Sequence, residues 1–252
     1  MSSSQPNSPE VPPQGTSLRL EEAVHSNSAE VLAAVASNPL LNENFALAFL
    51  KRTDLPVEAL EGLSKNAAAM KSRKVKLALV EHPKTPRHIS LPMVKHLFTF
   101  DLMRLTLAPA VPSDVKTAAD VALCNRAETI PSGQRLTLAH RASGRVATEL
   151  LSDSEPRVIH AALENSRLTE AHVIKAVTRA NVLPVLVHAV CQHSKWSLRR
   201  EIRIALLRNQ HTPMARAVEF AASFPLPILR DILHGSRIPV NIREHLLEIR
   251  SS

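Results

Sequence analysis

The chain has 252 residues, of which 44% are hydrophobic and 21% are charged, so it can bury a substantial core and does not have the composition of a disordered protein. It contains only five glycines and six phenylalanines and has no tyrosine, which argues against an all-β sandwich. The formal charge is +8, and residues 127–252 hold 17 basic against 11 acidic side chains, so an electrostatic partner would be attracted to the second half.

The first segment, residues 1–17, is rich in Ser, Pro, Gln and Asn, and we expect it to be disordered because it has almost no apolar surface to bury. It lacks the basic and apolar regions of a secretory signal, and no part of the chain approaches the run of about 18 apolar residues that a membrane helix needs. Only two cysteines occur, Cys124 and Cys191. We therefore predict a cytoplasmic protein with reduced thiols and no membrane span.

From residue 18 onward, short apolar segments alternate with breaks of Pro, Asn and Ser, a pattern typical of helices of roughly 8–12 residues joined by tight turns. We predict helices at about 28–36 and 43–51. Asn38 is expected to adopt the left-handed conformation that ends the first helix, and the Asn42 side chain is expected to cap the second.

The next break, Glu81-His82-Pro83-Lys84, is followed by Thr85-Pro86. This pair predicts the start of a helix, with the Thr85 hydroxyl accepting a backbone N–H group and Pro86 in the first helical position. A later helix is expected to begin near Pro112.

The second half repeats this arrangement. Helices are predicted at about 155–163 and 170–178, with Thr169 capping the second of them. Thr212-Pro213 starts another helix, and the last begins near Pro239. In total we predict roughly sixteen short helices, or about eight amphipathic pairs that stack to bury their apolar faces.

The two halves also align with each other. Residues 31–125 fall on residues 158–252 without a gap when they are shifted by 127 positions. Matched identities include Asn38 with Asn165, Arg73 with Arg200, and Thr85-Pro86 with Thr212-Pro213. A long internal repeat of helical units predicts an α-solenoid. We expect an all-α fold of short antiparallel helix pairs in two tandem 127-residue units, at residues 18–125 and 126–252, that continue one into the other.

Two phrases, VIHAALENSRLTEAHVIKAV and the stretch that begins EIRIALLRNQHTPMARAVEF, resemble bacterial HEAT-like repeat proteins, including the leucine-rich-repeat-variant type. The resemblance covers roughly residues 18–250 and rests on helix pairs punctuated by Asn and Thr-Pro. It implies a right-handed superhelix that binds another molecule, and it implies no catalytic residue, because such families share a scaffold and not a chemistry.

Basic residues at matched positions of the two halves are the best candidates for partner binding, because a solenoid places equivalent residues along one ridge. A solvated face with ordinary salt bridges is the alternative reading. Trp196, the only tryptophan, is either a contact for a partner or a plug in the core. The full candidate set is Arg52, Arg73, Lys76, Lys116, Arg179, Trp196, Arg199, Arg200, Arg203 and Arg243.

These residues predict a non-enzymatic scaffold or adaptor that binds a protein partner through a concave, partly basic surface. A nucleic-acid binder that contacts phosphates with the same Arg and Lys residues is the second hypothesis. A HEAT-like DNA glycosylase is a remote third, because no Asp or Tyr near Trp196 completes the set of residues that such enzymes need. We expect no metal and no cofactor, since the His and Cys residues lack paired ligand spacing and no Gly-rich phosphate loop occurs.

Overall fold

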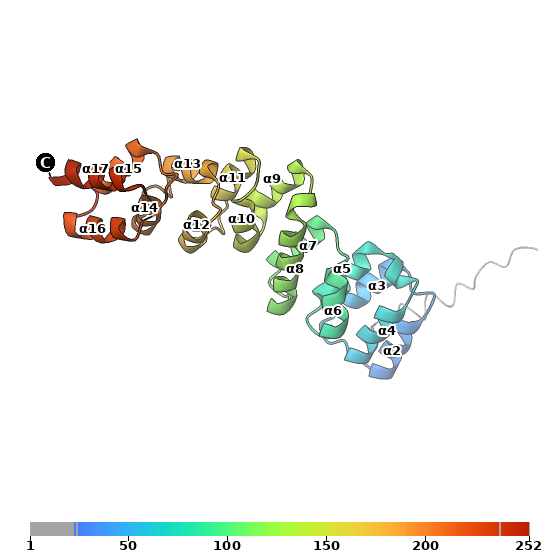
Figure 1. Ribbon diagram of the computed structural model, residues 1–252. Coiled ribbons are helices and arrows are strands. Elements are labelled where there is room, and N and C mark those ends of the chain that lie inside the picture. Colours follow the sequence, from blue (N-terminus) through green and yellow to red (C-terminus); the bar gives the residue numbers. More distant parts are fainter. Residues whose placement is uncertain (1–22, 24, 237, 252) are drawn as a thin grey trace, which may run out of the picture. The chain divides into compact units, whose positions relative to one another are not determined.

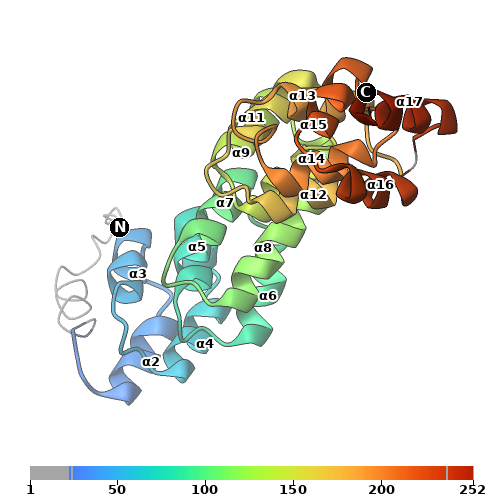
Figure 2. The ribbon, with the colours of Figure 1, turned by 90° about the vertical axis from the view of Figure 1, so that its left-hand side faces the viewer.

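The computed structural model describes residues 23, 25–236 and 238–251 (Figure 1). As predicted, the chain is all-α: the described residues form sixteen α-helices and two 3-10 helices, with no strand among them (Figure 2). The segment at residues 1–17, for which we predicted disorder, lies outside the described residues.

The described chain divides into two compact units. One contains the described residues up to Asp101 together with Ala108–Val115, and the other contains Leu102–Leu107 and the described residues from Lys116 onward. The first helices along the chain are α2 (Ala29–Ser37), α3 (Glu43–Leu50), α4 (Val57–Lys65), η1 (Ala69–Lys71), α5 (Arg73–Glu81), α6 (Arg87–Val94), α7 (Thr99–Leu107) and α8 (Ser113–Arg126). The others are η2 (Ala127–Thr129), α9 (Ser132–Arg141), α10 (Gly144–Leu150), α11 (Pro156–Leu163), α12 (Glu170–Val177), α13 (Pro184–Gln192), α14 (Arg200–Leu207), α15 (Met214–Ala222), α16 (Leu226–His234) and α17 (Val240–Ser251).

Four of the predicted helices, at 28–36, 43–51, 155–163 and 170–178, correspond to α2, α3, α11 and α12, and each boundary lies within one residue of the prediction. Two of the predicted N-caps, Asn42 and Thr169, are also confirmed. The Asn42 side chain accepts the backbone N–H of Phe45 at 2.9 Å, and the Thr169 hydroxyl accepts that of His172 at 3.4 Å. Local sequence therefore determines where these helices begin.

The prediction for Thr85-Pro86 was wrong in two respects: the helix starts one residue later than predicted, and the Thr85 hydroxyl does not cap it. Helix α6 begins at Arg87, so Pro86 and not Thr85 is the N-cap residue. The buried Thr85 hydroxyl instead donates to the carbonyl oxygen of Leu79 at 2.6 Å. The last carbonyls of a helix have no partner within it, so a buried hydroxyl beside the end of α5 satisfies one of them. Thr212 makes the matching bond to Leu206, also at 2.6 Å.

The prediction of a left-handed Asn38 was also wrong. Its φ is −71°, and among the described residues no residue other than glycine has a positive φ. The side chain provides the stabilisation instead, because Asn38 Oδ1 accepts the backbone N–H of Leu40 at 2.9 Å and closes the turn locally.

Several helices are each followed by a polar residue. Its side chain bonds to carbonyl oxygens at the end of the helix that comes two helices earlier in the chain. At the end of α4, Asn66 Nδ2 donates to the carbonyl oxygens of Ala36 and Asn38 at 3.0 and 2.8 Å. After α11, Asn165 Nδ2 donates to those of Ala139 and Ala142 at 2.7 and 3.1 Å. These bonds satisfy terminal carbonyls that no helix can satisfy for itself.

Two further residues do the same. His82 Nε2 lies 2.8 Å from the carbonyl oxygen of Arg52, at the end of α3, and Asn209 Nδ2 lies 2.8 Å from that of Val177, at the end of α12. We call this set the cross-helix caps: Asn66, His82, Asn165 and Asn209. Each one fixes the spacing between the ends of two helices that are not consecutive in the chain.

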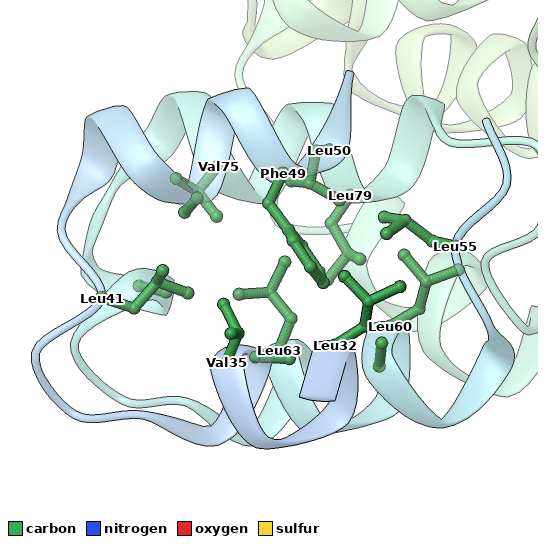
Figure 3. Packing of buried hydrophobic residues seen from close by; sticks show 14 residues of the cluster. Leu32, Val35, Leu41, Phe49, Leu50, Leu55, Leu60, Leu63, Val75 and Leu79 are labelled. Carbon is green, nitrogen blue, oxygen red and sulfur yellow. The ribbon is translucent and has the colours of Figure 1, made fainter. Parts of the chain in front are cut away.

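Apolar packing follows the same spacing, with α2 against α4 and α3 against α5 in one unit, and α9 against α11, α11 against α13 and α12 against α14 in the other. In the first unit, Phe49 of α3 projects between Leu32 of α2, Leu60 and Leu63 of α4, and Leu79 of α5 (Figure 3). Each helix supplies one apolar face to this core, so no helix pair buries its apolar residues alone.

Candidate functional site

Most of the predicted basic residues are engaged by other groups of the protein. Arg52 Nη2 lies 2.6 Å from an Asp54 carboxylate oxygen, and Nη1 donates to the Ser26 carbonyl at 2.7 Å. The hydrogen bond from Arg52 lowers the pKa of Asp54 to about 2. Arg52 therefore holds the end of α3 in place and offers little charge to a partner.

Arg73, the first residue of α5, is paired as well. Its Nε and Nη2 donate to the two carboxylate oxygens of Asp101 at 2.7 and 2.9 Å, and its guanidinium carbon lies 4.4 Å from the centre of the Phe98 ring. Asp101 is only 8% exposed, so its charge is committed to Arg73. The carboxylate and the aromatic ring together hold the guanidinium flat against the unit. Lys76, one turn further along α5, is exposed.

Three more predicted residues lie apart from the hollow described below. Arg179 donates to the Ser152 hydroxyl at 2.6 Å and pairs with the Glu149 carboxylate at 3.2 Å. Lys116 on α8 and Arg243 on α17 are half-buried. None of the three lines that hollow.

The structure brings together the remaining predicted residues around the start of α14. Arg199 is the N-cap residue, Arg200 is the first helical residue, and Arg203 follows one turn later. Arg200 and Arg203 line a hollow of about 180 Å³ whose other walls are Leu198, Ser223 and Phe224. Leu198 is 69% exposed. The hollow therefore combines two guanidinium groups with an accessible apolar side chain.

Aromatic rings of the second unit position the cations of this surface. The guanidinium carbon of Arg203 lies 5.4 Å from the centre of the Phe220 ring, and that of Arg200 lies 5.9 Å from the centre of the Phe224 ring. Arg203 Nε also donates to the Ser197 carbonyl at 2.7 Å. These contacts reduce the rotamer freedom of both arginines before any partner arrives.

Trp196 belongs to the core. It is 2% exposed, and its Nε1–H donates to the Leu163 carbonyl oxygen at 2.9 Å. The ammonium of Lys195 lies 4.0 Å from the centre of its ring. Of the two roles left open by the sequence, the structure shows the plug, and Trp196 contributes to the surface only by supporting Lys195.

Most of the cations around the start of α14 have no acidic partner among the described residues. Among the described residues, the carboxylate that pairs with Arg200 is that of Glu201, at 3.6 Å; both side chains are exposed, so the pairing is weak. Among the described residues, no carboxylate pairs with Lys195, Arg199 or Arg203. We define the basic–aromatic surface as Lys195, Leu198, Arg199, Arg200, Arg203 and Phe224.

Sequence reasoning missed two members of this surface, Lys195 and Leu198, whereas its interpretation of Phe224 as a core residue is confirmed, because Phe224 is 3% exposed. A signal was present for Leu198, since an apolar residue directly before two arginines in a turn is unlikely to be buried. The position of Phe224 beside Arg200 depends on how α15 packs against α14, which the sequence does not specify.

A larger hollow of about 570 Å³ lies elsewhere in the second unit, lined by residues that include Cys124, Arg135, Glu149 and Asp153. Three of its charged side chains are paired within the protein, because Arg135 lies 2.7 Å from Asp153 and Glu149 lies 3.2 Å from Arg179. Burial raises the pKa of the Cys124 thiol to about 11, so the thiol is protonated near neutral pH and is a poor nucleophile.

Comparison with known proteins adds no relative: no family model, no curated protein and no solved structure matches the chain. Within the described ranges, no group of three or more His, Cys, Asp or Glu side chains is placed to hold a metal ion. The described helices are all too short or too polar to cross a membrane.

Proposed function

We propose that the chain is a helical-repeat scaffold that binds a protein partner through the basic–aromatic surface and catalyses no reaction. The observation that carries this proposal is a pair of arginines, Arg200 and Arg203, held against aromatic rings beside exposed Leu198 and left without a strong internal counter-charge. Arginine is enriched at protein interfaces, and two arginines meet there with an exposed apolar side chain in one hollow.

The scaffold part of the proposal is a HEAT-like α-solenoid of two tandem units, at residues 18–125 and 126–252, whose matched residues are 127 positions apart. Its support is the position of the helices. Helices α3, α4 and α7 begin and end 127 residues before α12, α13 and α16. The Thr85–Leu79 bond recurs as Thr212–Leu206, with both partners shifted by 127, and Asn209, which lies 127 residues after His82, likewise bonds to a carbonyl at the end of an earlier helix. Such recurrence favours descent of both halves from one helical unit.

Nucleic acid is the alternative partner, since the same arginines could contact phosphates. The aromatic side chains argue against it. Trp196, Phe220 and Phe224 are at most 3% exposed, so none of them presents a face on which a base can stack. The accessible apolar group is Leu198, which suits a partner side chain better than a base.

The proposal is tested by placing a photo-crosslinking amino acid at Leu198 in the full-length protein, with Leu40 as the matched control. Both leucines are highly exposed, at 69% and 62%, but Leu40 lies outside the basic–aromatic surface. After irradiation in a cell extract, we expect discrete protein adducts from position 198 that are missing from position 40. They should disappear when Arg200 and Arg203 are both changed to Glu. Adducts that are sensitive to nuclease, or identical patterns from both positions, would refute protein binding at this surface.

A further inference from the structure

The first unit contains a pairing that the second unit lacks. Arg73, the first residue of α5, bonds to Asp101, the third residue of α7, while it lies over Phe98. Arg200 is likewise the first residue of α14, and it lies near an aromatic ring, that of Phe224. The third residue of α16, where Asp101 would correspond, is Ile228.

The second unit has Ile228 at the position that matches Asp101, so this position supplies no carboxylate to Arg200. Helix α14 packs against α16 (Figure 1), so the start of α16 is the element from which Arg200 would receive a counter-charge. Ile228 is 37% exposed and supplies an apolar surface instead. The guanidinium of Arg200 lies 5.9 Å from the centre of the Phe224 ring, and among the described residues the carboxylate paired with it is that of the exposed Glu201, at 3.6 Å.

We infer that the hollow at Arg200 and Arg203 receives a carboxylate from an acidic segment of a partner protein, with an apolar side chain of that segment against Leu198. The partner carboxylate takes the position that Asp101 takes in the first unit. A bidentate pair of this kind has both geometric specificity and strength, because the guanidinium fork matches the two carboxylate oxygens. This inference rests on the proposed function and specifies the chemistry of the partner.

The charge of the surroundings supports an acidic occupant. Arg203 lines the same hollow, Lys195 and Arg199 are exposed cations that precede Arg200 in the chain, and the acidic side chain paired with Arg200, that of Glu201, is exposed on the same helix. An isolated anion such as phosphate would satisfy Arg200 but would leave Leu198 in water. A segment with a carboxylate next to an apolar side chain satisfies both, which is why we favour a peptide over a nucleic acid.

The test uses Ile228→Asp, which places the missing carboxylate on α16, and Ile228→Asn, which removes the same apolar side chain without adding charge. Fluorescence anisotropy of the full-length protein is measured at physiological salt with a labelled peptide of alternating Asp and Leu. The same peptide with Asn for Asp and a labelled oligothymidylate serve as the other probes. Circular dichroism checks that both variants keep the helical content of the unmodified chain.

We expect the Asp–Leu peptide to bind the unmodified chain and the Asn–Leu peptide to bind at least about tenfold more weakly. Ile228→Asp should weaken the Asp–Leu peptide by about tenfold or more, because an internal carboxylate then occupies Arg200, while Ile228→Asn should stay within about threefold. Equal effects of the two variants would overturn the inference but leave the proposed function standing, since the peptide would then bind elsewhere on the surface. Binding of oligothymidylate without binding of either peptide would overturn both.

Discussion

The cross-helix caps should contribute far more stability than polar residues that end a helix locally, and Asn66 and Asn38 allow a matched comparison. Both residues end a helix of the first unit, and both can be changed to Ala. Asn66 is 7% exposed and makes four hydrogen bonds: two from Nδ2 to the carbonyls of Ala36 and Asn38, and two from the N–H groups of Ala68 and Ala69 to Oδ1. The Asn38 side chain accepts one bond, from the backbone N–H of Leu40, at a partly exposed position.

The expected magnitudes follow from what each truncation leaves unsatisfied. Asn66→Ala removes the donor from two carbonyls, one of them the fully buried Ala36 carbonyl, and each unsatisfied buried group costs about 1–3 kcal/mol. Allowing for partial relaxation, we expect a loss of about 2–4 kcal/mol of unfolding free energy. Asn38→Ala exposes its single N–H partner to water, and should cost below about 1 kcal/mol.

Urea unfolding followed by circular dichroism measures both variants against the unmodified chain. Because the two residues lie in the same unit, any difference reports the cross-helix bonds and not the location in the chain. Equal losses for the two variants, or a loss below about 1 kcal/mol for Asn66→Ala, would show that these bonds do not couple the helices energetically.

Three further predictions follow from local geometry. Burial lowers the pKa of His82, so the stability that the neutral imidazole contributes is present above pH 6.5 and is lost as the pH falls below that value. Asn makes the equivalent bond at the other cross-helix caps, so His82→Asn should remove this pH dependence from the unfolding free energy measured by urea unfolding. Gly144→Ala should destabilise the protein, because the new Cβ would lie 2.5 Å from a backbone carbonyl oxygen, whereas Gly133→Ala, with nothing within 4 Å, should raise the melting temperature slightly. Burial raises the pKa of both thiols to about 11, so alkylation by iodoacetamide should be slow at neutral pH for both, and slower for the fully buried Cys191 than for the half-buried Cys124.

Helix positions could be predicted from the sequence because their signals are local. Asn42 and Thr169 cap the helices that follow them through bonds to residues only three positions away, and the apolar spacing along α3 and α12 indicates which face is buried. Information of this kind lies within one turn of the chain, so no knowledge of the tertiary structure is needed.

The errors concern polar side chains whose partners are distant or lie behind them in the chain. The Thr85 hydroxyl was assigned to the helix that follows, but it bonds to Leu79 at the end of the helix before. The partner of His82 is Arg52, 30 residues away. A sequence shows that a residue can donate or accept a hydrogen bond, but the choice among partners depends on which helix ends pack together.

Part of the candidate surface could be predicted because charge counts and matched positions can be read directly from the sequence. Charge counts favoured the second half, and Arg200 and Arg203 were identified because they match Arg73 and Lys76. The matching alone predicts equal roles for Arg73 and Arg200, whereas the structure separates them.

The separation of these two arginines explains why a repeated sequence position need not be a repeated site. Asp101 forms an ion pair with Arg73 inside the first unit, so the charge of that arginine is neutralised within the protein. Ile228 cannot do this for Arg200, which pairs weakly with the exposed Glu201. An apolar side chain at the position of the carboxylate leaves the Arg200 guanidinium with a weak partner, the exposed Glu201, whereas Arg73 at the matched position is held by two hydrogen bonds to a buried carboxylate.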